Sequence, residues 1–128
     1  MPSVPRRFPP FFPRLILFIT ALLLSYNALA FDSGAIGTVR LADLPPAARQ
    51  TIALIRQGGP FPYEKDGAIF GNYEKVLPRQ KRGYYREFTV KTPHARNRGA
   101  RRIISGGWPP REYYYTADHY RSFERVIE

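Results

Sequence analysis

Alternating apolar and polar positions mark the strands of this chain, most clearly in the segment 84–90. Tyr85, Glu87 and Thr89 share one face of the predicted strand, and the residues between them share the other. Similar segments bounded by turn residues predict further strands at 68–70, 100–105, 112–116 and 120–127. Because the later segments follow one another closely, with short turns, we expect an antiparallel sheet.

A helical pattern precedes these strands. The pair Pro45-Pro46 favours a first helical turn, because the missing N–H of proline costs nothing there. Ala48, Ile52 and Ile55 then recur at helical spacing until Gly58-Gly59 ends the segment. One helix followed by antiparallel strands predicts an α+β fold, in which the N-terminal helix packs on a small twisted sheet.

The first thirty residues have the composition of a targeting segment. Three arginines lie among the first fourteen residues, Leu15–Leu24 is apolar, and Ala28–Ala30 matches an A-x-A cleavage site. The alternative is an uncleaved membrane anchor, but the polar residues 25–27 end the apolar run before the ~20 residues needed to span a bilayer. We therefore expect a signal peptide at 1–30, one secreted domain at 31–128, and no stable membrane association after cleavage.

Charge narrows the class of partner. The chain has 20 Lys and Arg against 10 Asp and Glu, and the part after residue 30 has 17 against 10. This excess indicates a polyanionic partner such as nucleic acid, or an anionic surface. The absence of cysteine excludes disulfides and thiolate metal sites, and the two histidines form no metal-binding spacing. We expect neither a metal ion nor another cofactor.

The few acid–base groups suggest chemistry on a phosphodiester. Cleavage of RNA without a metal needs a base for the 2′-OH, an acid for the departing 5′-oxygen, and cations around the transition state. Glu87 on its strand and His119 in a later turn suit the first two roles, and arginines in the segment 96–102 suit the third. Strand parity allows only one of Arg101 and Arg102 to point into the cleft. The plain alternatives are a surface ion pair and a solvated histidine.

Four stretches of the chain match a known family. They are LPPAARQTIALIRQGGPFPYEKDGAIFGNYEKVLP (44–78), GYYREFTVKTP (83–93), ARNRGARRII (95–104) and YYYTADHYRSF (113–123). In these stretches the chain resembles the guanyl-specific microbial ribonucleases, the barnase-like extracellular family, and within it the small actinobacterial enzymes. The matches keep the family's order and cover nearly all of the expected mature chain.

The resemblance implies an enzyme that cleaves single-stranded RNA after guanosine. The implied route is transesterification to a 2′,3′-cyclic phosphate, followed by hydrolysis to the 3′-phosphate. By the same resemblance Glu87 is the general base and His119 the general acid, while Arg98 and Arg102 bind the phosphate with Tyr120 beside them. The choice of Arg98 over its neighbouring arginines rests on the resemblance alone.

The resemblance also assigns guanine recognition to the loop 70–74. Main-chain N–H groups around Asn72 and Tyr73 would meet O6 and N7 of guanine, and Glu74 would accept from N1–H and the exocyclic amine. Phe70 would stack on the base. The chain departs from its relatives in having Gly71 where they carry glutamine, and Tyr73 where they often carry arginine.

Two further expectations concern partners. We expect a monomer, and the resemblance implies a small acidic cytosolic inhibitor of the barstar type. A different hypothesis is a non-catalytic cationic protein that binds RNA or the cell envelope, which the positive charge supports equally well. Against that hypothesis stands the complete set of Glu87, Arg98, Arg102 and His119, which charge binding alone does not require.

Overall fold

The structure is a computed structural model that describes residues 36–128. The predicted signal peptide at 1–30 lies outside the described residues. Between residues 36 and 128, no helix combines the length and the apolar character needed to cross a membrane.

The predicted helix is α2, Pro46–Gln57. It ends at Gly58, whose φ of 84° lies in the left-handed region that favours glycine, and the Gly58 N–H donates to the carbonyl of Ile55 at 3.2 Å. The helix buries one stripe against the sheet, as its spacing predicts. The buried residues of this stripe are Ala48, Thr51, Ile52 and Ile55.

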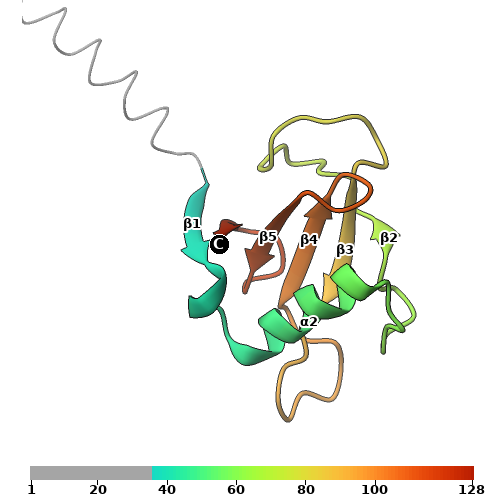
Figure 1. Cartoon of the computed structure of the whole chain (residues 1–128), viewed down its shortest axis with the longest axis vertical. Helices are drawn as coiled ribbons and strands as arrows, with labels where there is room; N and C mark the ends of the chain where they lie inside the picture. The colour runs from blue at the N-terminus through green and yellow to red at the C-terminus, as the bar shows by residue number, and fades with distance from the viewer. Residues whose placement is uncertain (1–35) are drawn as a thin grey trace, which may run out of the picture. The chain divides into compact units, whose positions relative to one another are not determined.

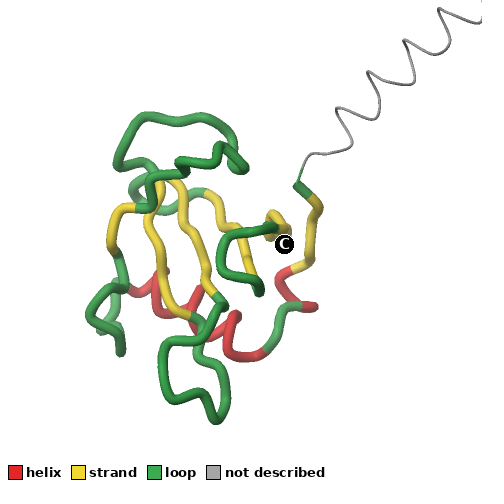
Figure 2. Tube along the Cα trace, turned by 180° about the vertical axis from the view of Figure 1, so that it is seen from behind, coloured by secondary structure: helices red, strands yellow, loops and turns green. Residues whose placement is uncertain are grey.

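Six strands form one sheet in the order β1-β6-β5-β4-β3-β2. Their bounds are Gly37–Arg40 (β1), Ala68–Ile69 (β2), Tyr85–Thr89 (β3), Arg102–Gly106 (β4), Glu112–Thr116 (β5) and Glu124–Ile127 (β6). A short 3-10 helix, η2, spans Leu41–Asp43. Helix α2 covers one face of the sheet (Figure 1), and the view from behind shows the face that the helix leaves open (Figure 2). The α+β class is confirmed.

Two details of the sheet differ from the sequence prediction. Four of the five strand pairings are antiparallel, but β1 runs parallel to β6, with Gly37 opposite Glu124. The last strand begins at Glu124 and not at residue 120, because His119 and Tyr120 have φ values of 56° and 74°. Such values do not occur in a regular strand, so residues 117–123 form a loop.

The core has two parts, one on each face of the sheet. Phe88, Val90 and Ile103 pack against α2, whereas Tyr85 and Ile104 belong to a cluster on the open face. The alternation predicted for 84–90 is therefore confirmed. Glu87 has the same parity as Tyr85, so it projects from β3 onto the open face, where a ligand can reach it.

Candidate active site

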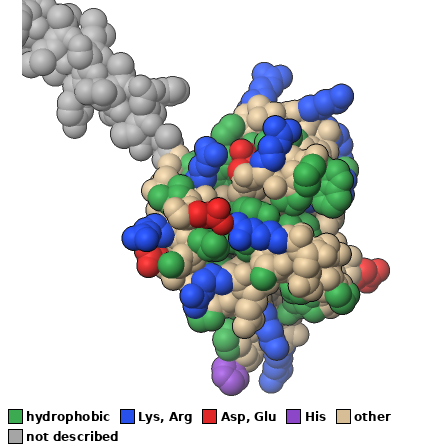
Figure 3. Space-filling model, in the orientation of Figure 1, with side chains coloured by type: hydrophobic (Ala, Val, Ile, Leu, Met, Phe, Trp, Pro, Cys, Tyr) green, Lys and Arg blue, Asp and Glu red, His purple; other side chains and the backbone are tan. Residues whose placement is uncertain are grey.

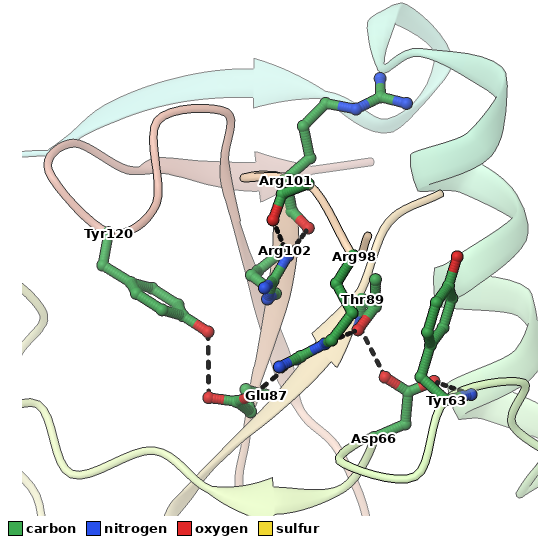
Figure 4. A network of polar contacts seen from close by, with 9 residues as sticks. Tyr63, Asp66, Glu87, Thr89, Arg98, Arg101, Arg102 and Tyr120 are labelled. Atoms are coloured by element: carbon green, nitrogen blue, oxygen red, sulfur yellow. Dashed lines mark hydrogen bonds and ion pairs between the residues drawn. The ribbon is translucent and has the colours of Figure 1, made fainter. Parts of the chain in front are cut away.

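Glu87 lies at the centre of a set of charged and polar side chains on the open face. Its Oε1 accepts a hydrogen bond from Nη2 of Arg98 at 2.9 Å, and its Oε2 accepts one from the Tyr120 hydroxyl at 2.9 Å (Figure 4). The Glu87 side chain is 17% exposed and that of Arg98 26%. The carboxylate is thus fixed in orientation and still open to a ligand.

Arg98 comes from the loop between β3 and β4 and is held by the end of β3. Its Nε donates to Oγ1 of Thr89 at 3.0 Å. The backbone of Thr89 is fixed in turn, because its N–H donates to Oδ1 of Asp66 at 2.8 Å. The other oxygen of Asp66 accepts from the N–H of Tyr63 at 3.2 Å. Asp66 therefore ties the loop before β2 to the strand that carries Glu87.

Arg102 is almost fully buried, with 3% exposure. Its Nη1 donates to the carbonyls of Gly99 and Arg101, at 3.0 and 2.9 Å, and its guanidinium lies between Tyr120 and Arg98 (Figure 4). Within residues 36–128, the Nε of Arg102 is the one buried side-chain nitrogen or oxygen without a hydrogen-bond partner. Arg101 points elsewhere, since its Nε donates to Thr92 Oγ1 at 3.2 Å.

His119 and Tyr120 belong to a loop that side-chain hydrogen bonds hold in place. The buried Thr116 hydroxyl accepts from the N–H of Tyr120 at 3.1 Å and donates to Oδ1 of Asp118 at 2.9 Å. Asp118 also accepts from the N–H and the hydroxyl of Ser122, at 2.9 and 2.6 Å. These bonds stabilise a turn in which two consecutive residues have positive φ.

His119 is exposed at the edge of the site. The backbone N–H of His119 donates to the carbonyl of Ala100 at 3.0 Å, and this bond joins the loop to the one that carries Arg98. The imidazole lies beside the Tyr120 ring, with the ring centroids 4.8 Å apart. Its exposure leaves the imidazole accessible to a ligand.

Two groups in this region have shifted pKa values. Burial, and then the charge of Glu87, raises the pKa of Tyr120 to about 12, although the charge of Arg102 acts in the opposite direction. The Tyr120 hydroxyl is therefore a hydrogen-bond donor at neutral pH. The hydroxyl and N–H of Ser122, and then the Thr116 hydroxyl, lower the pKa of Asp118 to about 2. Asp118 is consequently ionised at neutral pH.

A pocket of about 180 Å³ adjoins this cluster. All five residues predicted to bind substrate line it, together with Val76 and Phe123; the five are Phe70, Asn72, Tyr73, Glu74 and Tyr120. The Phe70 ring lies 4.9 Å from that of Tyr120 and 6.0 Å from that of Phe123, measured between centroids. The pocket therefore has an aromatic wall that continues into the Glu87 cluster through Tyr120.

The loop at this pocket is held from inside by Asn72. Its Oδ1 accepts from the N–H of Leu77 at 3.1 Å, and its Nδ2 donates to the Leu77 carbonyl at 2.9 Å. Within residues 36–128, no hydrogen bond of the structure uses the N–H groups of Asn72, Tyr73 or Glu74. The Asn72 side chain is thus committed to the loop, while three backbone donors are left for a ligand.

The structure gives no metal cluster in its described part: among residues 36–128, no three His, Asp or Glu side chains are placed together as ligands.

Sequence reasoning missed the residues that position the site. Thr89 has the same parity as Glu87, so the alternation itself could have identified it. Asp66, Thr116 and Asp118 gave no such signal, because each acts through a contact that only the folded chain creates or through a local turn that resembles an ordinary loop.

Comparisons with known proteins identify the family of this chain. The family model for ribonucleases matches residues 27–127. Guanyl-specific ribonuclease St of Saccharopolyspora erythraea is 52% identical over 96 residues, which are 75% of this chain and 93% of that protein. Guanyl-specific ribonuclease Sa of Kitasatospora aureofaciens is 56% identical over 90 residues, which are 70% of this chain and 93% of that protein.

Solved structures of ribonuclease Sa2 are similar to this chain in fold and in sequence. A crystal structure of ribonuclease Sa2 with guanosine-2′-cyclophosphate has a TM-score of 0.68 and 44% identity, covering 73% of this chain and 97% of that one. A structure of ribonuclease Sa2 with mononucleotides has a TM-score of 0.71, also at 44% identity, covering 73% of this chain and 96% of that one. By sequence, fold and family match, this chain belongs to the ribonuclease family.

Proposed function

We propose that this protein is a guanyl-preferring endoribonuclease that cleaves single-stranded RNA at the cluster around Glu87. The observation that carries the proposal is the position of this carboxylate, which Arg98 and Tyr120 hold beside the pocket at the loop 70–74. The relatives named guanyl-specific ribonucleases, at 52% and 56% identity, support the same substrate class.

In the proposed first step, Glu87 removes the proton of the 2′-OH of guanosine. The 2′-oxygen then attacks the phosphorus, and the bond from phosphorus to the 5′-oxygen of the next nucleotide breaks. His119 gives its proton to that leaving oxygen. The products are a 2′,3′-cyclic phosphate and a free 5′-hydroxyl. In the second step the roles reverse, and water opens the ring to a 3′-phosphate.

The two arginines would stabilise the negative charge that grows on the phosphate oxygens. Arg98 already contacts Glu87, and Arg102 has an unpartnered buried Nε close to the same centre. Guanidinium groups held in a partly buried site act more strongly on such charge than they would in water. Tyr120, protonated at neutral pH, would hold the carboxylate and contact the phosphate.

Guanine would occupy the pocket at the loop 70–74. The free N–H groups of that loop suit O6 and N7, and the carboxylate of Glu74 suits the adjacent donors N1–H and N2–H₂, which no other base presents. Phe70 offers a face for stacking, worth about 1–3 kcal/mol per base.

We further propose that the protein is secreted as a monomer after removal of residues 1–30, whose composition supports a signal peptide. An active ribonuclease would damage RNA in the cell that makes it. A small acidic cytosolic inhibitor of the barstar type is therefore proposed as a partner, and the positive charge of this chain would speed their association.

The test is cleavage of the dinucleotide GpU and of a mixed-sequence RNA, both in EDTA, by the purified domain 31–128. We expect cleavage after G, with a cyclic phosphate appearing first. Glu87→Gln and His119→Ala should each lower kcat/KM by about a hundredfold or more, as expected for loss of a general base or acid. Intact GpU would refute the function. If both variants degraded RNA as fast as the unsubstituted domain, the cleavage would come from a contaminating nuclease, and the hypothesis of a non-catalytic cationic protein would be favoured.

A further inference from the structure

A second pocket lies against the loop 70–74 and has a strongly basic lining. Its volume is about 220 Å³, and Lys75, Arg79, Lys81 and Arg82 contribute to its wall. All four side chains belong to exposed residues. The four residues proposed for catalysis do not line this pocket; they are Glu87, Arg98, Arg102 and His119. This basic pocket is therefore separate from the Glu87 cluster.

The segment that carries these cations is fixed at several points. Leu77 is buried, with 2% exposure. The Tyr85 hydroxyl donates to the carbonyl of Pro78, and the N–H of Tyr84 donates to the carbonyl of Lys81 at 3.0 Å. Because the backbone is held on both sides of Arg79, the cations are presented at defined positions.

These charges are not neutralised within the described chain. The ion pairs among residues 36–128 are Arg56–Glu128, Arg98–Glu87 and Arg125–Glu112, and none involves the basic pocket. Lys and Arg side chains gather at the top of the domain in Figure 3, where Figure 1 draws the long loop between β2 and β3. The lining of the basic pocket includes no Asp or Glu, and clustered cations of this kind favour a polyanionic ligand.

Tyr73 forms a wall shared by the basic pocket and the proposed guanine pocket. Tyr73 is 80% exposed, yet its hydroxyl accepts a hydrogen bond from Nη1 of Arg82 at 3.1 Å. The ring lies over Gly71 so closely that a Cβ there would stand 2.5 Å from two ring carbons. Phe70, Asn72 and Tyr73 line both pockets. The two pockets are thus adjacent, and Tyr73 is one of the residues between them.

We propose that the basic pocket binds the backbone phosphate on the 5′ side of the guanosine, a proposal that rests on the proposed function. Tyr120 reaches from Glu87 into the guanine pocket, and Tyr73 continues from there to the basic pocket. The scissile phosphate, on the 3′ side, would lie at Glu87. In the other direction the backbone leaves the guanosine on its 5′ side. The phosphate there is negatively charged, and the cations of the basic pocket would bind it.

The test compares three substrates: GpU, the 5′-extended UpUpGpU and the 3′-extended GpUpUpU. The variant is the double substitution Arg79→Gln with Lys81→Gln, and the matched control is Arg40→Gln with Arg49→Gln, exposed residues of β1 and α2. We expect the variant to lower kcat/KM on UpUpGpU by about threefold to tenfold at low salt, and to reduce its salt slope by about 0.7 per lost phosphate contact. GpU and GpUpUpU should be cleaved as before, and the control variant should leave all three unchanged.

A second measurement separates this proposal from the proposed function. Fluorescence anisotropy of UpUpGpU with 2′-deoxyguanosine, which cannot be cleaved by a 2′-OH mechanism, should show weaker binding to the variant by a similar factor. An equal loss on GpU, an equal loss on GpUpUpU, the same loss in the control, or no loss on any substrate would each overturn the proposal. Failure of the unsubstituted protein to cleave GpU would instead overturn the proposed function.

Discussion

Asp118 offers a sharp test of how the His119–Tyr120 loop is held. Its carboxylate accepts three hydrogen bonds, from the hydroxyl and N–H of Ser122 and from the Thr116 hydroxyl. Asp118→Asn keeps the size of the side chain and removes its charge. We expect the variant to fold, to be less stable at neutral pH, and to hold the loop less firmly.

The magnitude follows from the pKa of Asp118. A value of about 2 against the ordinary 3.8 corresponds to about 2 kcal/mol at ~1.4 kcal/mol per pKa unit. The loop borders solvent, which screens such interactions, so about 1 kcal/mol is the expected loss in the free energy of unfolding. Since the pKa is lower in the folded state, this stabilisation is complete above about pH 4 and disappears as the pH falls towards 2.

The assay is urea unfolding of both proteins, followed by circular dichroism, at pH 7, 5, 3 and 2. The difference in unfolding free energy should stay near ~1 kcal/mol at pH 7 and 5 and shrink towards zero by pH 2. Asp43→Asn, in the exposed η2, is the control and should show no such trend. A difference that is independent of pH would refute the electrostatic origin.

Three further changes test other parts of the molecule. Tyr120→Phe removes a hydrogen bond to a charged carboxylate, so kcat/KM on GpU should fall by about tenfold, while unfolding free energy changes little; full activity would contradict the assigned contact. Gly71→Ala places a methyl group on the Tyr73 ring, so it should displace that ring and raise KM for guanosine substrates more than it lowers kcat; an unchanged KM would show that the ring moves freely. Ile103→Ala, at a fully buried position against α2, should lower the unfolding free energy by about 2–5 kcal/mol, measured by urea denaturation, and a loss under ~1 kcal/mol would mean that the core collapses around the gap.

Local patterns predicted most of the fold. Helix α2 matches the prediction because prolines start it, glycines end it and its apolar residues recur at helical spacing. Strand β3 likewise shows the predicted alternation of faces. The parallel pairing of β1 with β6 was not predictable in this way, because it joins Gly37 to Glu124 across nearly the whole domain and local patterns do not specify which distant strands pair.

The sequence predicted the main charged residues of the site but not the residues that position them. Charge and parity indicated Glu87 and one of the two adjacent arginines, and the resemblance to known ribonucleases supplied the distinction between Arg98 and its neighbours. The hydrogen bonds that position these side chains could not be predicted from the sequence. Asp66 reads as a turn residue beside Gly67, and its bond to the backbone of Thr89 exists only because β2 and β3 pair. The prediction of a strand at 120–127 was too long for a related reason, since the bonds of Thr116 and Asp118 impose a turn on residues that alternate like a strand.

The pairing of the first strand with the last also sets an order of assembly. During synthesis β1 appears before every other strand of the sheet, yet its partner β6 is the last to appear, so that edge of the sheet cannot close until the domain is nearly complete. Contacts between such distant segments slow folding, because a large loop must close before they form. Residues 117–123, which carry His119 and Tyr120, lie directly before β6. The loop that would complete the catalytic cluster is therefore among the last segments to be synthesised, and the sequence order itself delays the appearance of an active ribonuclease.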